Sequence, residues 1–142
     1  MTEAVEKHWG DPERSQNREV FDKGEAGTAI VWLCVAALVT LLLEVVYLGQ
    51  WWTINGVAIP VPWTIPVAYV MNLILTNTAL LWTSKRTLAA APVWCWVAGY
   101  LIITAWTSLP FGGDAAYGPW LRAIALLAAG VAGGAWPLRH SR

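Results

Sequence analysis

Four long apolar segments, separated by short polar ones, dominate the hydrophobic pattern of the chain. Each is about 20 residues long, and they cover residues 27–49, 63–82, 88–109 and 119–137. A helix rises about 1.5 Å per residue, so each segment matches the roughly 30 Å hydrocarbon core of a bilayer. Because backbone groups in lipid must be hydrogen-bonded within their own segment, the pattern predicts helices. The predicted fold class is all-α: an integral membrane four-helix bundle with up-down-up-down topology over residues 27–137.

The composition supports a membrane protein and gives no sign of a nucleic-acid partner. Only 13% of the 142 residues are charged, whereas a soluble domain has about 25%. The mean hydropathy is +0.50. Nine basic and nine acidic residues balance, and no basic patch indicates nucleic-acid binding. The bias toward Ala, Gly, Trp and Arg fits a bacterial source, and the bilayer is the expected surrounding.

The positions of lysine and arginine predict the orientation. Eight of the nine lie before the first apolar segment, between the second and third, or after the fourth, while the segments 50–62 and 110–118 contain none. Basic residues favour the cytoplasmic side. We therefore expect a multi-pass protein of the cell (inner) membrane with both termini in the cytoplasm. Ten of the eleven tryptophans lie near segment ends, five expected at each interface, as two aromatic belts require.

The two ends of the chain are polar. Residues 1–26 contain seven of the nine acidic residues and form a predicted cytosolic tail, as do residues 138–142. Within the first tail, Asp11 and Pro12 are typical of a helix start, and Gly24 of a helix end. A short helix over residues 12–23 is one interpretation, and a disordered tail is the other. The loop 50–62 is expected to lie along the outer interface.

Two ionisable residues, Glu44 and Arg122, lie inside the apolar segments. Each is about five residues from the outer end of its segment, so both lie at a similar depth. A charge within a span is costly unless it is paired. This predicts an ion pair between the first and last helices. The alternatives are that both side chains extend separately to the headgroups, or that Arg122 pairs with Asp114.

An intramembrane carboxylate such as Glu44 is also a candidate proton or cation site. A four-span chain with a glutamate in its first span resembles the small multidrug-resistance transporters, which implies a small coupled transporter. Their glutamate lies near mid-membrane and their loops have a weak charge bias, whereas Glu44 lies near the outer edge here. The strong orientation signal also argues against an antiparallel dual-topology dimer.

A polar face is predicted on the second segment. It comprises Tyr69, Asn72, Thr76 and Asn77. One interpretation is that these residues form hydrogen bonds between helices, each of which stabilises the bundle by about 0.6 kcal/mol. The alternative is that they form a polar lining for a solute path. Tyr69 is expected level with Glu44, where its hydroxyl can donate to the carboxylate.

A small-residue face is predicted on the fourth segment. Gly130 and Gly134, like Ala129 and Gly133, are four residues apart. This spacing allows another backbone to approach closely. The partner helix can belong to this chain, to a second copy or to another membrane protein, and a tight seam within the chain is the preferred interpretation.

The sequence contains no pattern typical of an enzyme. Cys34 and Cys95 are too far apart for a CxxC motif and are expected to be small apolar core residues, while His8 and His140 lie outside the apolar segments. We expect no catalytic residue, no metal and no cofactor. The favoured function is a non-enzymatic accessory or scaffold subunit that packs against other membrane proteins. The alternative is a proton- or cation-coupled transporter using Glu44 and the Asn72 face.

Overall fold

The computed structural model describes residues 22–110 and 119–141. These residues form five helices and one β-hairpin: α1 (Lys23–Leu48), β1 (Trp51–Ile54), β2 (Val57–Pro60), α2 (Thr64–Trp82), α3 (Arg86–Ala89), α4 (Ala91–Thr107) and α5 (Trp120–His140). Three of them, α1, α2 and α5, are long and apolar enough to cross a membrane, while α4 is a shorter apolar helix. The fold is therefore mostly helical and compatible with a multi-pass membrane protein.

Helix α1 begins four residues earlier than its apolar segment. Asp22 and Glu25 form a capping box, in which the backbone N–H of Asp22 donates to the Glu25 carboxylate at 3.2 Å. This box satisfies N–H groups at the helix start that otherwise lack partners. Most of the proposed helix over residues 12–23 lies outside the described residues.

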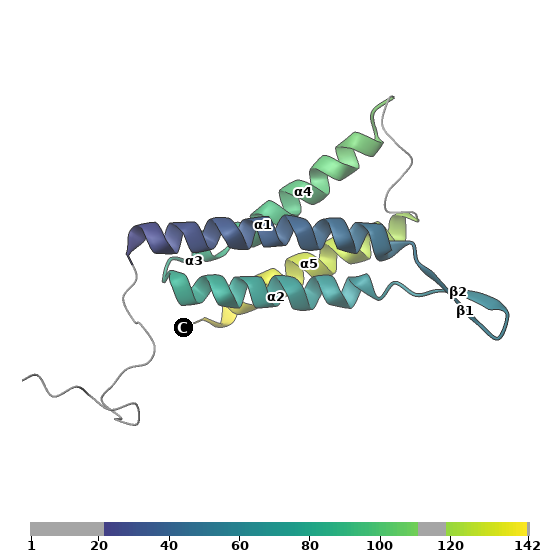
Figure 1. The fold of residues 1–142 in the computed structure, drawn as a ribbon, viewed down its shortest axis with the longest axis horizontal. Helices are drawn as coiled ribbons and strands as arrows, with labels where there is room; N and C mark the ends of the chain where they lie inside the picture. Colours follow the sequence, from purple (N-terminus) through teal and green to yellow (C-terminus); the bar gives the residue numbers. More distant parts are fainter. Residues whose placement is uncertain (1–21, 111–118, 142) are drawn as a thin grey trace, which may run out of the picture.

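A β-hairpin follows α1, so the prediction of an all-α chain was incomplete. Strands β1 and β2 pair antiparallel, with Ile54 opposite Val57. Asn55 and Gly56 form the two-residue turn with φ angles of 51° and 79°. Asn-Gly is favoured in such turns because both central residues must adopt positive φ. All eight strand residues are exposed, and the hairpin extends beyond the helices (Figure 1).

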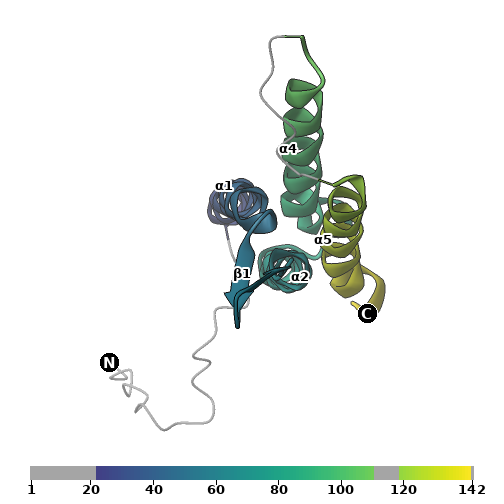
Figure 2. The same cartoon turned by 90° about the vertical axis from the view of Figure 1, so that its right-hand side faces the viewer.

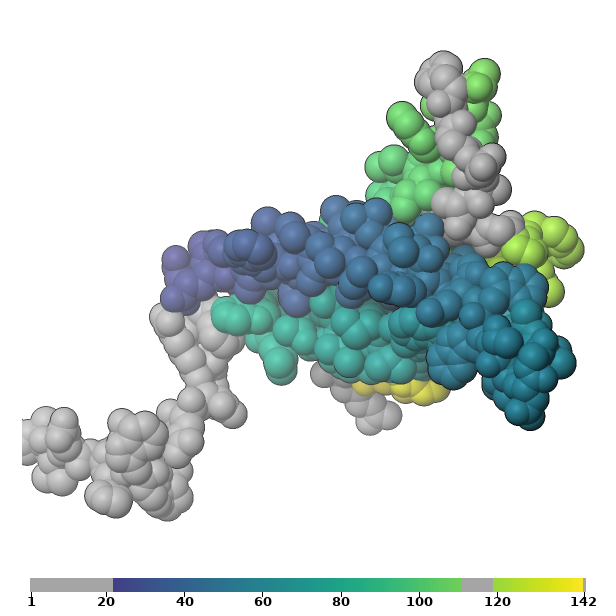
Figure 3. Space-filling model, turned by 45° about the vertical axis from the view of Figure 1, so that its right-hand side comes forward, coloured from purple at the N-terminus to yellow at the C-terminus, as the bar shows by residue number. Residues whose placement is uncertain are grey.

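The structure does not confirm the predicted up-down-up-down four-helix bundle. Helix α2 packs against both α1 and α5, whereas α4 contacts α1 mainly through its first half. Figure 2 views α1 and α2 nearly end-on, yet α4 is seen from the side. The space-filling view shows α1 and α2 side by side, with α4 standing away from them (Figure 3). The second half of α4 thus leaves the bundle.

The third and fourth apolar segments also differ at their ends. The third is divided into α3 and α4 at Ala90, next to Pro92. Proline favours the first turn of a helix, which explains a new start here. Helix α5 continues to His140, so the predicted tail is helical over residues 138–140. Arg86 donates to the carbonyl of Ser141 and holds this end against the loop between α2 and α4.

Candidate functional site

The centre of the candidate site is Glu44, a carboxylate inside the helix bundle. Glu44 lies on α1 and only 2% of it is exposed. The indole Nε1 of Trp96, on α4, donates a hydrogen bond to its Oε2 at 2.9 Å. The other oxygen, Oε1, has no hydrogen-bond partner among the described residues. A buried carboxylate with one unused acceptor is costly in a protein interior.

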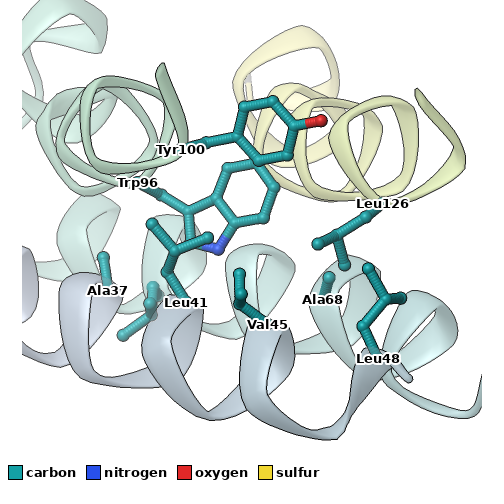
Figure 4. Packing of buried hydrophobic residues seen from close by; sticks show 9 residues of the cluster. Ala37, Leu41, Val45, Leu48, Ala68, Trp96, Tyr100 and Leu126 are labelled. Carbon is teal, nitrogen blue, oxygen red and sulfur yellow. The ribbon is translucent and has the colours of Figure 1, made fainter. Parts of the chain in front are cut away.

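Trp96 is held in place by three helices. It is fully buried and stacks on Tyr100 of the same helix, with ring centroids 5.8 Å apart. Figure 4 shows both rings above Leu41 and Val45 of α1. On α5, a Cβ added at Gly130 would come within 2.4 Å of the Trp96 ring. The tryptophan therefore fits only because residue 130 has no side chain.

The small-residue face of α5 is used inside the chain. Besides the contact of Gly130 with Trp96, a Cβ at Gly134 would lie 2.1 Å from Val93 of α4, and one at Gly133 would lie 2.0 Å from the backbone oxygen of Tyr69 on α2. Gly133 thus lets α5 meet α2 backbone to backbone. The sequence left open whether this face packs against the same chain, a second copy or another protein. In the structure, helices of the same chain, α2 and α4, pack against the three glycines. Ala129 is half-buried beside them.

A cleft of about 240 Å³ opens between α1 and α2 beside Glu44. Its lining is apolar apart from a few side chains and comprises Thr40, Leu43, Glu44, Tyr47, Trp63, Thr64, Val67 and Met71. The rings of Tyr47 and Trp63 contact each other with centroids 5.8 Å apart. Thr64 is 1% exposed, and its hydroxyl oxygen has no partner among the described residues.

The predicted ion pair between Glu44 and Arg122 is absent from the structure. The guanidinium of Arg122 lies over the ring of Trp51, 5.7 Å from its centroid, and Glu44 is bound to Trp96. The reason is the packing: α5 lies mainly against α2, and α1 lies against α2 and α4, so α1 and α5 make little contact. Asp114, the alternative partner of Arg122, lies outside the described residues.

The predicted polar face of α2 is divided between two sides of the helix. Asn72 and Thr76 are fully buried, one turn apart. Asn72 Nδ2 donates to the carbonyl of Ala68 at 3.0 Å, while its Oδ1 and the Thr76 hydroxyl have no partner among the described residues. Asn77 is exposed and lies in a groove near the end of α5. Tyr69 was expected to donate its hydroxyl to Glu44. The hydrogen bond to Glu44 comes instead from the indole of Trp96.

Other chemistry-bearing residues form no metal-binding cluster in residues 22–110 and 119–141. Cys34 on α1 and Cys95 on α4 are neighbours across the two helices, and both are free cysteines. From the sequence, both were expected to be small apolar core residues. Their meeting follows from the crossing of α1 and α4, which the sequence does not reveal.

Trp96 was expected in an interfacial belt, but it is buried and bonded to Glu44. The sequence carries little signal for its burial, because both faces of α4 are apolar: Trp96 is buried, whereas the neighbouring Trp94 is 68% exposed. Comparison with known proteins adds no relative, since no family model, no curated protein and no solved structure matches the chain. The site is therefore interpreted from its own geometry.

Proposed function

We propose that the chain is a four-span protein of the cell membrane with both ends in the cytoplasm, and that it acts as an accessory subunit of another membrane protein. The orientation is supported by the eight lysines and arginines that the four spans would place on one side of the membrane. It is also consistent with the fold, because the start of α1 and the end of α5 lie at the same end of the bundle (Figure 1).

The observation that carries the accessory role is the uncovered second half of α4. No residue of α4 beyond Tyr100 is buried. Leu101, Ile102 and Trp106 are 56%, 68% and 57% exposed. The hydroxyls of Thr104 and Thr107 donate to carbonyls of their own helix. This half of α4 is thus an apolar surface whose polar groups are already satisfied, as a contact with another transmembrane helix requires.

The length of α4 supports the same interpretation. Seventeen residues give about 25 Å, less than the roughly 30 Å core of a bilayer. The inclination of α4 relative to α1 and α2 shortens its reach across the membrane further (Figure 2). A partner helix placed between the second half of α4 and α1 would cover both surfaces and support α4 in a spanning orientation.

Site-specific photocrosslinking in native membranes tests the accessory role. A photoreactive phenylalanine at position 102, on the uncovered half of α4, is expected to give one discrete adduct with a different membrane protein. The matched control is position 81 on α2, because Leu81 is 74% exposed and lies outside the proposed contact with α4 and α1. An adduct with a second copy of this chain, or equal labelling by lipid at both positions, would contradict the proposal.

A proton- or cation-coupled transporter is the second candidate, and the unpartnered Glu44 Oε1 favours it. The cleft ends on Glu44 and Thr64, however, and its lining does not include Asn72. A continuous path would need to extend past Thr64 to Asn72 and Thr76, which are fully buried. Proton flux into liposomes that contain the purified protein, measured under a pH gradient, tests this candidate. A transporter should show a flux that Glu44→Gln abolishes and that Trp94→Phe leaves unchanged.

A further inference from the structure

Two buried oxygen atoms that have no hydrogen-bond partner in the described part of the chain belong to residues that line the same cleft. They are Oε1 of Glu44 on α1 and the hydroxyl oxygen of Thr64 on α2. Both residues are more than nine-tenths buried, at 2% and 1% exposure. Buried polar atoms almost always have a hydrogen-bond partner, so two exceptions in one cleft indicate a missing group.

The chemistry of these atoms calls for a hydrogen-bond donor, and a carboxylate favours one with a positive charge. An ionised carboxylate accepts hydrogen bonds and cannot donate them, and a hydroxyl oxygen also accepts. A guanidinium or ammonium group supplies several N–H donors and compensates the charge of Glu44. The adjacent rings of Tyr47 and Trp63 offer aromatic faces, which also attract cations.

The size and depth of the cleft favour a single side chain. Its volume of about 240 Å³ is below the roughly 300–1,000 Å³ of pockets for drug-sized ligands. Glu44 lies four residues before the end of α1, which corresponds to about 6 Å along the helix. A cation from another helix would therefore meet Glu44 about one turn below the membrane surface.

The described basic residues of this chain do not supply that cation. Arg122 is directed onto the ring of Trp51. Lys23, Lys85, Arg86 and Arg139 lie at the opposite end of the helices, near the start of α1 and the ends of α2 and α5. Among residues 22–110 and 119–141, no basic side chain is placed on Glu44, and we assign its complement to another chain.

We propose that the cleft between α1 and α2 receives an arginine or lysine side chain from a transmembrane helix of the partner protein, with Glu44 as its counter-ion. This inference rests on the proposed accessory function and names the chemistry of the partner. The Thr64 hydroxyl accepts a second hydrogen bond from the same group. The apolar wall formed by Leu43, Val67 and Met71 packs against the methylene part of the side chain.

A two-by-two binding experiment tests the charge pairing. The purified full-length protein, wild type or Glu44→Gln, is placed in phosphatidylcholine vesicles with a labelled synthetic helix of about 20 leucine and alanine residues. The peptide carries either arginine or glutamine about one turn from its outer end. We expect energy transfer to report at least tenfold tighter binding for wild type with the arginine peptide than for the other three combinations. Equal binding in all four combinations would overturn the proposal.

Two further variants keep the test decisive if Glu44→Gln fails to fold. Met71→Trp fills the cleft and is expected to reduce binding of the arginine peptide at least tenfold, while Leu81→Phe at the exposed far end of α2 has no effect. Undiminished binding to Met71→Trp would overturn the proposal. The proposal would also be overturned if the protein bound benzylammonium in a Glu44-dependent way but did not bind the arginine peptide. The cleft would then be a small-molecule site.

The outcome for the cleft is separable from the accessory role itself. If the peptide results fail while the photoreactive group at position 102 still gives one discrete adduct, only the proposed charge pairing is wrong. If position 102 gives no protein adduct, the accessory function fails whatever the peptide does.

Discussion

Trp96 donates its indole N–H to Oε2 of Glu44 at 2.9 Å, and this bond joins α4 to α1 inside the bundle. The two residues are 52 positions apart in the sequence, and both are almost completely buried. A hydrogen bond contributes about 0.5–1.5 kcal/mol to stability between neutral groups and about 1.5–3 kcal/mol when one group is charged. The pair therefore helps to place the first half of α4, from which its second half extends outward.

Replacing Trp96 by phenylalanine is expected to destabilise the protein by about 1–3 kcal/mol, because Glu44 then loses its hydrogen-bond donor. Thermal unfolding in mild detergent, followed by circular dichroism, measures the change. Trp94→Phe is the matched control, since Trp94 lies on the same helix and is 68% exposed. Equal destabilisation by the two substitutions would show that the bond to Glu44 contributes little.

Gly133→Ala is expected to destabilise the protein by about 1–3 kcal/mol, as overpacking of a tight contact usually does. Its Cβ would lie 2.0 Å from the backbone oxygen of Tyr69, so α2 and α5 would have to separate. Gly27→Ala is the control, because a Cβ at Gly27 on α1 meets no atom within 4 Å. That change should be neutral or stabilise the helix by up to about 1 kcal/mol. A neutral Gly133→Ala would disprove the close approach of these helices.

The positions of the long helices could be predicted from the sequence because hydrophobic length alone sets them. Helix α2 covers Thr64–Trp82, within one residue of the predicted segment. The small-residue spacing of Gly130 and Gly134 also identified a close-packing face. These features are local, since each depends on a run of residues or on the helical repeat.

The arrangement of the helices could not be predicted in the same way. Matching depth suggested that Glu44 pairs with Arg122, but depth does not determine which helices are neighbours, and α5 packs on α2 instead of α1. The hairpin is a different case. Asn55-Gly56 between two apolar runs is a strong hairpin signal, and assigning this loop to the membrane interface overlooked it.

Oxidation with copper phenanthroline is expected to join Cys34 and Cys95 in a disulfide within one chain. Their side chains are neighbours across α1 and α4, and a disulfide forms only when two cysteines are already close. The two thiols each lose a proton and together transfer two electrons to the oxidant. Intact mass should fall by about 2 Da, and both thiols should become unreactive to maleimide after denaturation, as thiolates are the reactive species. A protein that stays reduced under these conditions would contradict the crossing of α1 and α4.

The orientation of the chain is tested by adding single cysteines to a variant in which Cys34 and Cys95 are replaced by alanine. Gly56→Cys lies at the turn of the exposed hairpin, and Ser84→Cys lies in the short connection between α2 and α3. The basic residues Lys85 and Arg86 beside Ser84 favour the cytoplasmic side. A membrane-impermeant maleimide should therefore label Gly56→Cys in intact cells and Ser84→Cys only after the membrane is opened. The reverse pattern would overturn the proposed orientation, and it would also place the Glu44 cleft at the cytoplasmic surface.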